Sequence, residues 1–168
     1  STPTPPGNPY TSSPWSHTGN EGIDFSDSDY NNNVVDWVLV SLRTSINKAD
    51  QVAQTAALLY KDGSIQTVIP CLLASSDGPF YIVVEHRNHM GIMSPLPVNL
   101  INNELIFDFT AQDSYVQPGG VGQKLLAPGI WGMFAGDIDQ TDTGSYDIIG
   151  TDKAIWNEDN GNFDMYIP

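Results

Sequence analysis

Short runs of branched and aromatic residues, separated by turn signals, constrain the fold of this chain more than any other feature. The clearest runs lie at 34–43, 56–60 and 80–87. Runs of this length and composition are typical of β-strands. The Asp62-Gly63 dipeptide follows the second run and predicts a hairpin to residues 65–68, because both residues tolerate the backbone angles of a tight turn.

The first run predicts a strand in the middle of a sheet. Its side chains alternate between two faces, with Trp37, Leu39 and Ser41 on one side and Val38, Val40 and Leu42 on the other. Successive residues of a strand point to opposite faces. Since both faces are largely apolar, we expect both to be covered.

Two further elements are predicted from weaker patterns. Asn102-Asn103 lies between Pro97–Leu100 and Glu104–Phe109, which suggests a second hairpin. Residues Lys48–Thr55 suggest a short helix. Six or seven short strands in residues 34–135 predict an all-β domain, an antiparallel two-sheet β-sandwich of the immunoglobulin or transthyretin kind.

Residues 1–33 form a segment rich in proline, serine and threonine, with five prolines among the first fourteen residues. Proline disfavours helix and favours extended backbone. The segment is therefore either a linker or an extended arm that docks on this domain or on a neighbouring subunit. Tyr10, Trp15 and Phe25 are the predicted partner-binding residues, because plain linkers rarely carry aromatic side chains.

The charge of the chain limits its partners. Twenty acids face six bases, a formal net charge of −14 with no basic cluster. Such a chain is a poor ligand for nucleic acid or an anionic membrane, and its apolar runs are too short to insert into a bilayer.

The single Cys71 excludes an intrachain disulfide and a cysteine-based zinc site. The start at Ser1, without an initiator methionine, fits a mature chain whose signal was removed or an excised module, and secretion is the favoured interpretation.

The acidic residues are concentrated in residues 136–168, which carry eight acids and one lysine, a net charge of −7. Calcium binds several hard oxygen ligands, and alternating aspartates in a short loop supply them. A solvated acidic turn is the alternative interpretation. A short helix is predicted to start near Thr151. The predicted ligands of a structural calcium ion are Asp137, Asp139, Asp142, Asp147 and Asp152.

The run His86-Arg87-Asn88-His89 also admits a catalytic or metal-binding interpretation. Histidines can transfer protons or bind metals. A structural role is favoured here: His86 or Arg87 is expected to pair with an acid on a neighbouring strand, such as Asp36 or Asp108. We predict no catalytic residue.

Four motifs carry a resemblance to a known family: VDWVLVSLR at 35–43, LYKDG at 59–63, VEHRNH at 84–89 and WGMFAGD at 131–137. They resemble a β-rich module of large secreted surface proteins of Bacteroidetes-type bacteria, which carries VDWVLVELR and RHRNH motifs and runs into a dockerin-like, EF-hand-type calcium repeat. The resemblance implies surface display and adhesion. It also implies that Asp137, Asp139 and Asp152 are the first, third-position and final calcium ligands, with an insertion of four residues between them.

These observations predict a non-enzymatic, calcium-stabilised extracellular structural or adhesion module. We expect it to associate with itself or with neighbouring surface modules, and to form filaments if the N-terminal arm inserts as a strand into the next subunit. The alternative is a carbohydrate-binding module of a larger secreted enzyme, in which an exposed tryptophan stacks on a polysaccharide.

Overall fold

The computed structural model describes residues 7–22, 33–67, 78–102, 104–116 and 122–135, whose regular structure is almost entirely β. Short 3₁₀ turns form η1 (Pro9–Thr11) and η2 (Lys48–Asp50). Over these ranges, no helix has the length and apolar character needed to cross a membrane. The described part of the chain agrees with the predicted all-β class. Its strands are β1 (Val34–Arg43), β2 (Gln51–Tyr60), β3 (Ile65–Gln66), β4 (Tyr81–His86), β5 (His89–Met93), β6 (Lys124–Ala127) and β7 (Ile130–Gly132).

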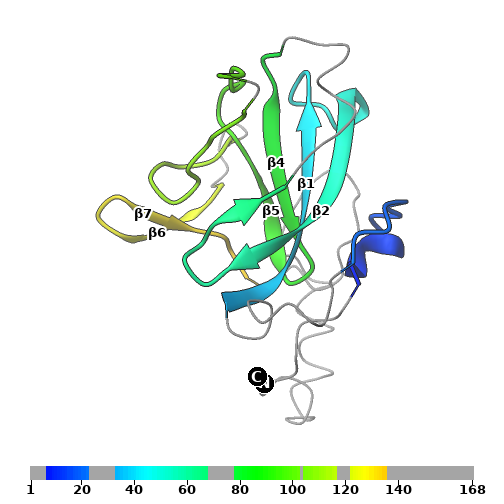
Figure 1. Cartoon of the computed structure of the whole chain (residues 1–168). Coiled ribbons are helices and arrows are strands. Elements are labelled where there is room, and N and C mark those ends of the chain that lie inside the picture. Colours follow the sequence, from blue (N-terminus) through cyan, green and yellow to red (C-terminus); the bar gives the residue numbers. More distant parts are fainter. Residues whose placement is uncertain (1–6, 23–32, 68–77, 103, 117–121, 136–168) are drawn as a thin grey trace, which may run out of the picture.

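β1 is the middle strand of a five-stranded antiparallel sheet with the order β3-β2-β1-β4-β5 (Figure 1). Leu39 pairs with Ala56 on one side and with Glu85 on the other. The prediction of a central strand at 34–43 is therefore confirmed. β6 and β7 form a separate two-stranded sheet, which projects to the left of the main sheet in Figure 1.

One face of the main sheet carries the larger apolar cluster. Partly buried side chains between residues 98 and 109, together with Met133, pack against it from outside the sheet. This loop-rich layer removes one face of β1 from water. The buried members of the cluster are Val38, Val40, Leu42, Ala57, Phe80, Ile82, Val84 and Ile92.

The opposite face carries a smaller cluster that includes an N-terminal residue. Trp37 and Leu39 of β1 and Ala56 of β2 are buried there with Tyr10, and Trp15 packs against them. The alternation of side chains along β1 thus supplies both clusters, as predicted. In Figure 1 the segment that carries Tyr10 (blue) lies beside the β2 side of the sheet.

Two tight turns connect neighbouring strands of this sheet. Gly63 has a φ of +83° in the β2–β3 connection, which confirms the predicted hairpin at Asp62-Gly63. This angle is easily reached only by a residue without a Cβ atom. Arg87 and Asn88 form the turn between β4 and β5, where His86 pairs with His89.

The predicted helix over Lys48–Thr55 is wrong. A single 3₁₀ turn occupies Lys48–Asp50, and β2 begins at Gln51. Pairing with β1, in which Ala53 lies opposite Leu42, gives this segment its backbone partners. The tertiary pairing overrides a weak local helix signal.

The second predicted hairpin is reduced to a single bridge between Ile101 and Glu104. Val98 instead exchanges both backbone hydrogen bonds with Phe80, at N–O distances of 2.7 and 3.0 Å. The segment before Asn102 therefore pairs with the residue that precedes β4, and its pairing with the segment after Asn102 is limited to Ile101 and Glu104.

Candidate functional site

Residues 7–22, hereafter the docked segment, pack on the main sheet through Tyr10. The Asn8 side chain accepts a hydrogen bond from the Tyr10 backbone N–H at 3.2 Å and so holds the turn η1. Tyr10 is fully buried, and its hydroxyl donates to the Trp37 carbonyl oxygen at 2.8 Å. Trp15 meets the Tyr10 ring edge to face, with ring centres 4.9 Å apart. Tyr10 thus fills the sheet face that β1 leaves apolar.

The surroundings of Tyr10 keep its hydroxyl neutral. Burial raises the pKa of this phenol well above its usual value of 10, and the negative charge of Asp36 raises it further. A neutral phenol can donate its proton to a carbonyl, whereas a phenolate cannot. The hydrogen bond to Trp37 therefore persists at any ordinary pH.

Glu21 fixes the other end of the docked segment to the edge of β2. Its Oε1 atom accepts from the Thr55 hydroxyl at 2.9 Å and from the Ala56 backbone N–H at 3.1 Å. β3 pairs with β2 at Leu58 and Leu59, so the Ala56 N–H lies beyond the end of β3. The carboxylate thus satisfies a backbone donor that the short β3 leaves uncovered.

Two residues of the docked segment also bind the Glu21 carboxylate. The His17 Nε2 atom lies 2.9 Å from Oε1, and the Asn8 amide donates to Oε2 at 3.0 Å. Burial alone would raise the pKa of Glu21, but the hydrogen bonds from His17, Thr55 and Ala56 lower it below the usual value. His17 also contacts the Gln54 side chain at 3.2 Å through Nδ1.

A second group of charged residues, the ionic cluster, consists of Asp36, His86, Arg87 and His89. Asp36 accepts two hydrogen bonds from Arg87 Nη2, at 2.8 and 2.9 Å, and His86 Nε2 lies 3.3 Å from the same carboxylate. Burial tends to raise the pKa of Asp36, but the hydrogen bonds from His86, Arg87 and Trp37 lower it to about 2. The prediction that His86 or Arg87 pairs with Asp36 is confirmed.

The two histidines of the ionic cluster contact each other across the β4–β5 turn. Their Nδ1 atoms are 2.9 Å apart, so one of them must carry a proton. His86 Nδ1 accepts the Asn88 backbone N–H at 3.1 Å, which assigns the donated proton to His89. Burial is the main cause that lowers the pKa of His89 below its usual value. The cluster joins the start of β1 to the end of β4 and lies beside Tyr10.

Contacts within the ionic cluster occupy the ring nitrogens with which His86 could bind a metal ion. His86 directs Nε2 to Asp36 and Nδ1 to Asn88 and His89, so both of its ring nitrogens are engaged. Within the described ranges, no group of three or more histidine, cysteine, aspartate or glutamate residues is arranged to hold a metal ion. The contacts of this cluster are those of a structural connection between strands.

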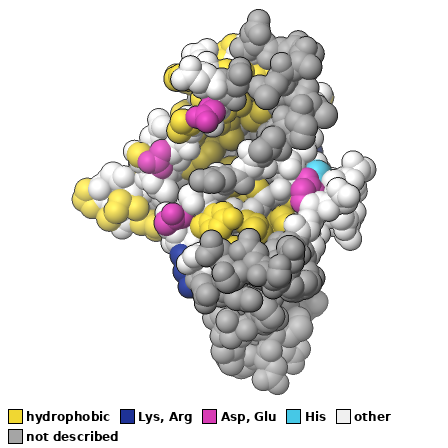
Figure 2. Space-filling view, viewed as in Figure 1, with side chains coloured by type: hydrophobic (Ala, Val, Ile, Leu, Met, Phe, Trp, Pro, Cys, Tyr) yellow, Lys and Arg dark blue, Asp and Glu magenta, His cyan; other side chains and the backbone are white. Residues whose placement is uncertain are grey.

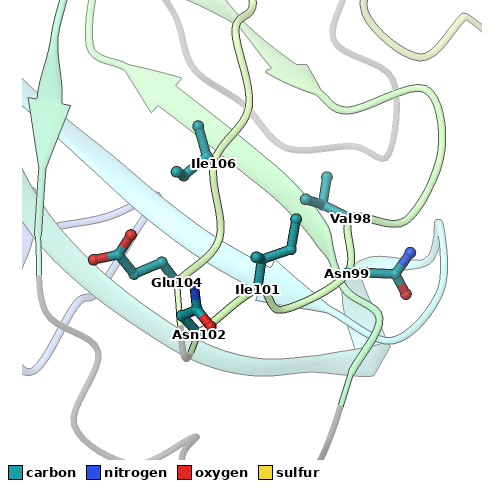
Figure 3. Close-up of a pocket in the computed structure, with 6 residues that line it drawn as sticks. All are labelled: Val98, Asn99, Ile101, Asn102, Glu104 and Ile106. Atoms are coloured by element: carbon teal, nitrogen blue, oxygen red, sulfur yellow. The ribbon is translucent and has the colours of Figure 1, made fainter.

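A shallow pocket of about 310 Å³ lies outside the main sheet, between the segments before and after Asn102 (Figure 3). Glu104 is the single ionisable residue among its six lining residues, and Ile101 and Ile106 are 69% and 76% exposed. The described residues that line the pocket are Val98, Asn99, Ile101, Asn102, Glu104 and Ile106. Its walls are thus largely open to solvent.

The β6–β7 hairpin exposes a further apolar surface. Leu125, Leu126 and Ile130 are 48%, 66% and 52% exposed. In Figure 2, hydrophobic side chains gather at the left of the molecule, where Figure 1 places β6 and β7. Trp131, on β7, is partly buried, and its backbone N–H donates to the Thr110 carbonyl oxygen at 2.8 Å.

Two of the predicted site residues lie in the part of the chain that the structure describes, and the others do not. Tyr10 and Trp15 are described and pack together on the sheet of their own chain. Phe25 and the five predicted calcium ligands, Asp137, Asp139, Asp142, Asp147 and Asp152, lie outside the described residues.

Sequence reasoning missed Glu21 and Arg43. Glu21 is the single acid of residues 7–22, which is a usable signal in a segment otherwise rich in small polar residues. Arg43 continues the alternating series of Trp37, Leu39 and Ser41 on a strand predicted to be buried, and a charge at such a position indicates a special environment.

Comparison of the chain with protein-family models, with curated proteins and with solved structures found no match.

Asn in place of Asp36 should destabilise the fold in a pH-dependent way. The folded-state pKa of about 2 lies below the ordinary 3.8, so the carboxylate contributes stability above about pH 4 and loses it as the pH falls toward 2. Asp36→Asn should lower the free energy of unfolding by about 2 kcal/mol at pH 7 and by far less at pH 2. Urea unfolding followed by fluorescence measures this, with the exposed Glu104→Gln as control. A loss that is independent of pH would contradict the assignment.

Removal of the Tyr10 hydroxyl should cost less than removal of its ring. Tyr10→Phe loses one buried hydrogen bond, about 1 kcal/mol, whereas Tyr10→Ala also leaves a cavity, about 3–5 kcal/mol in total. Because the folded-state pKa is raised, the contribution of the hydroxyl is complete below pH 10.0 and declines above it. Chemical denaturation measures both losses, with Tyr60→Phe as the matched control. Equal effects at positions 10 and 60 would show that Tyr10 is not buried on the sheet.

Proposed function

We propose that this chain is a non-enzymatic structural module of an extracellular or cell-surface assembly, and that copies join by exchanging the docked segment. The observation that carries this proposal is the set of contacts by which Tyr10 and Glu21 bind the sheet. They link a peptide of sixteen residues to a preformed face and strand edge. The same contacts serve equally well when the peptide comes from a second copy.

The length of the connection permits such an exchange. Ten residues, 23–32, separate the docked segment from the described residues before β1. A chain of ten residues reaches at most about 33–36 Å, enough to place the segment on an adjacent molecule. Reciprocal exchange gives a closed dimer, and head-to-tail exchange gives a filament. Tyr10 and Trp15 are then the partner-binding residues, and Phe25 is proposed to join them.

The finer fold is proposed on the same basis. The main sheet has an apolar cluster on each face, and the smaller β6–β7 sheet lies outside it. This layering supports a β-sandwich of the immunoglobulin or transthyretin kind. It is compatible with the resemblance to secreted Bacteroidetes-type surface modules, whose motifs fall on β1 and on the β4–β5 turn.

Calcium is proposed to act through the acidic residues 136–168. Asp137, Asp139, Asp142, Asp147 and Asp152 supply the oxygen ligands of a structural ion in this proposal. Copies with a net charge of −14 repel each other, and bound calcium lowers that repulsion. The ion thus favours both the fold and the association of copies.

The carbohydrate-binding alternative depends on exposed tryptophans. Trp131 is partly exposed on β7 and favours it. Trp37 is buried, however, and Trp15 packs edge-on against Tyr10. The tryptophans of the described residues do not offer several rings to one sugar surface, so self-association is the preferred function.

Chemical cross-linking distinguishes exchange from docking within one chain. Thr18 is exposed and follows His17, which contacts Gln54 of β2. In a Cys71→Ser background, Thr18→Cys combined with Gln54→Cys and a short bifunctional maleimide should give covalent oligomers on a denaturing gel. Single-cysteine variants report random collisions. Purely monomeric product, from a sample that sediments as an oligomer, would refute exchange.

Chelation should lower the melting temperature of the whole chain if calcium is structural, because a ligand that binds only the folded state stabilises it. Asp137→Asn with Asp139→Asn should abolish the difference between calcium and chelator. The matched control is Asp159→Asn with Asp164→Asn, which removes the same charge from acids outside the predicted ligand set. Unchanged melting of the unsubstituted chain in excess chelator would contradict a structural calcium ion.

A further inference from the structure

Arg43 is a buried cation at the end of β1. Its exposed fraction is 5%, and neither Nε nor Nη2 has a hydrogen-bond partner. Across the described residues, no carboxylate forms an ion pair with it. An arginine side chain stays protonated in proteins, so it cannot relieve this burial by losing its charge. A buried charge without a counter-charge is strongly unfavourable.

Ser41 lies beside Arg43 on the same sheet face. Residues 41 and 43 are two apart on β1, so both side chains point the same way, with about 7 Å between their Cα atoms. Ser41 is completely buried, and its hydroxyl also has no partner. Ser41 pairs with Gln54 on β2 and with Val83 on β4. Two neighbouring buried side chains therefore offer unused donors on one face.

The unused donors of Arg43 have a specific geometry. Nε–H and Nη2–H lie along one edge of the planar guanidinium and point in the same direction. This edge matches the two oxygens of a carboxylate, which binds it through two parallel hydrogen bonds. The Ser41 hydroxyl adds a third donor nearby. Arg87, by comparison, already uses Nη2 on Asp36.

We propose that Arg43 and Ser41 form a buried binding site for a carboxylate group, held side-on by the guanidinium. The site is separate from the docked segment and from the ionic cluster, and it does not depend on the function proposed above. Carboxylates are abundant in this chain, and twelve of its twenty acids lie outside the described residues. The group can come from such a side chain or from a small free carboxylate.

Proton–nitrogen NMR of the full chain tests this directly. The sequence has two arginines, so the spectrum has two Nε–Hε signals, assigned by loss of one of them in Arg43→Lys. Arg87 Nε has no hydrogen-bond partner and serves as the internal reference. A bound carboxylate should shift the Arg43 Hε signal downfield of the Arg87 signal and slow its exchange with water.

Two buffers of equal ionic strength identify the source of the carboxylate. A downfield Arg43 signal in chloride indicates a carboxylate of the protein. A signal that moves downfield only when acetate replaces chloride indicates a free carboxylate. An Arg43 signal that coincides with the Arg87 signal in both buffers would overturn the proposal.

Melting temperatures give a second, independent readout. With a carboxylate in place, Arg43→Met should lower the melting temperature more than Lys61→Met, which removes the same charge from an exposed position. Arg43→Lys should recover part of the loss, because lysine keeps the charge without the side-on pair. With no counter-charge, removal of the buried cation would raise the melting temperature, and that result would overturn the proposal. Ser41→Ala is the milder variant if Arg43→Met does not fold.

Discussion

The fold depends on the burial of both faces of β1. A strand with apolar side chains on both sides is stable only if both sides are removed from water. One face is covered by residues that follow β5 in the chain. The other face is covered, at Trp37 and Leu39, by Tyr10, which precedes β1 by more than twenty residues. The N-terminal segment is thus a layer of the core. Its described residues are not the predicted extended arm: they turn at η1, and an antiparallel bridge joins Gly7 to Gly22.

The charged groups at the two ends of β1 differ in whether the described residues pair with them. At the start of the strand, Asp36 has partners from β4 and the following turn, and its charge is fully compensated. At the end of the strand, Arg43 is buried without a carboxylate from the described residues. The hydrogen bonds that Asp36 accepts keep its carboxylate ionised. Arg43 is ionised without such help, because a guanidinium group does not lose its proton in proteins. Within the described residues, the same strand therefore carries one charge that is paired, Asp36, and one that is not, Arg43.

Local patterns predicted the parts of the fold that local chemistry controls. The alternation at 34–43 and the Asp62-Gly63 turn follow from side-chain period and backbone angles, and both were predicted correctly. The start of β2 was not predicted, because residues from Gln51 onward form a strand only through their pairing with β1. The predicted Asn102 hairpin is limited to the bridge between Ile101 and Glu104 for the same reason, since Val98 pairs with Phe80.

The candidate site could also be predicted only in part: the pairing at Asp36 follows from the sequence, and the role of Glu21 does not. The sequence predicts that His86 or Arg87 pairs with an acid on a neighbouring strand, such as Asp36 or Asp108, and the structure shows both residues at Asp36. The role of Glu21 was not accessible, because it depends on the length of β3. β3 ends after two residues and leaves the Ala56 N–H without a strand partner. No pattern within residues 7–22 encodes where another strand stops.

The short β3 also supports the proposed exchange of the docked segment between copies. A full-length neighbour would close the edge of β2 within one chain and leave no donor for Glu21. The side chain of Glu21 instead closes it, together with the insertion of Tyr10 into the sheet face. Both contacts are made by a peptide joined to the sheet through residues 23–32 alone. An edge covered in this way is protected against uncontrolled pairing, and in the proposed exchange the same edge would take the peptide of another copy.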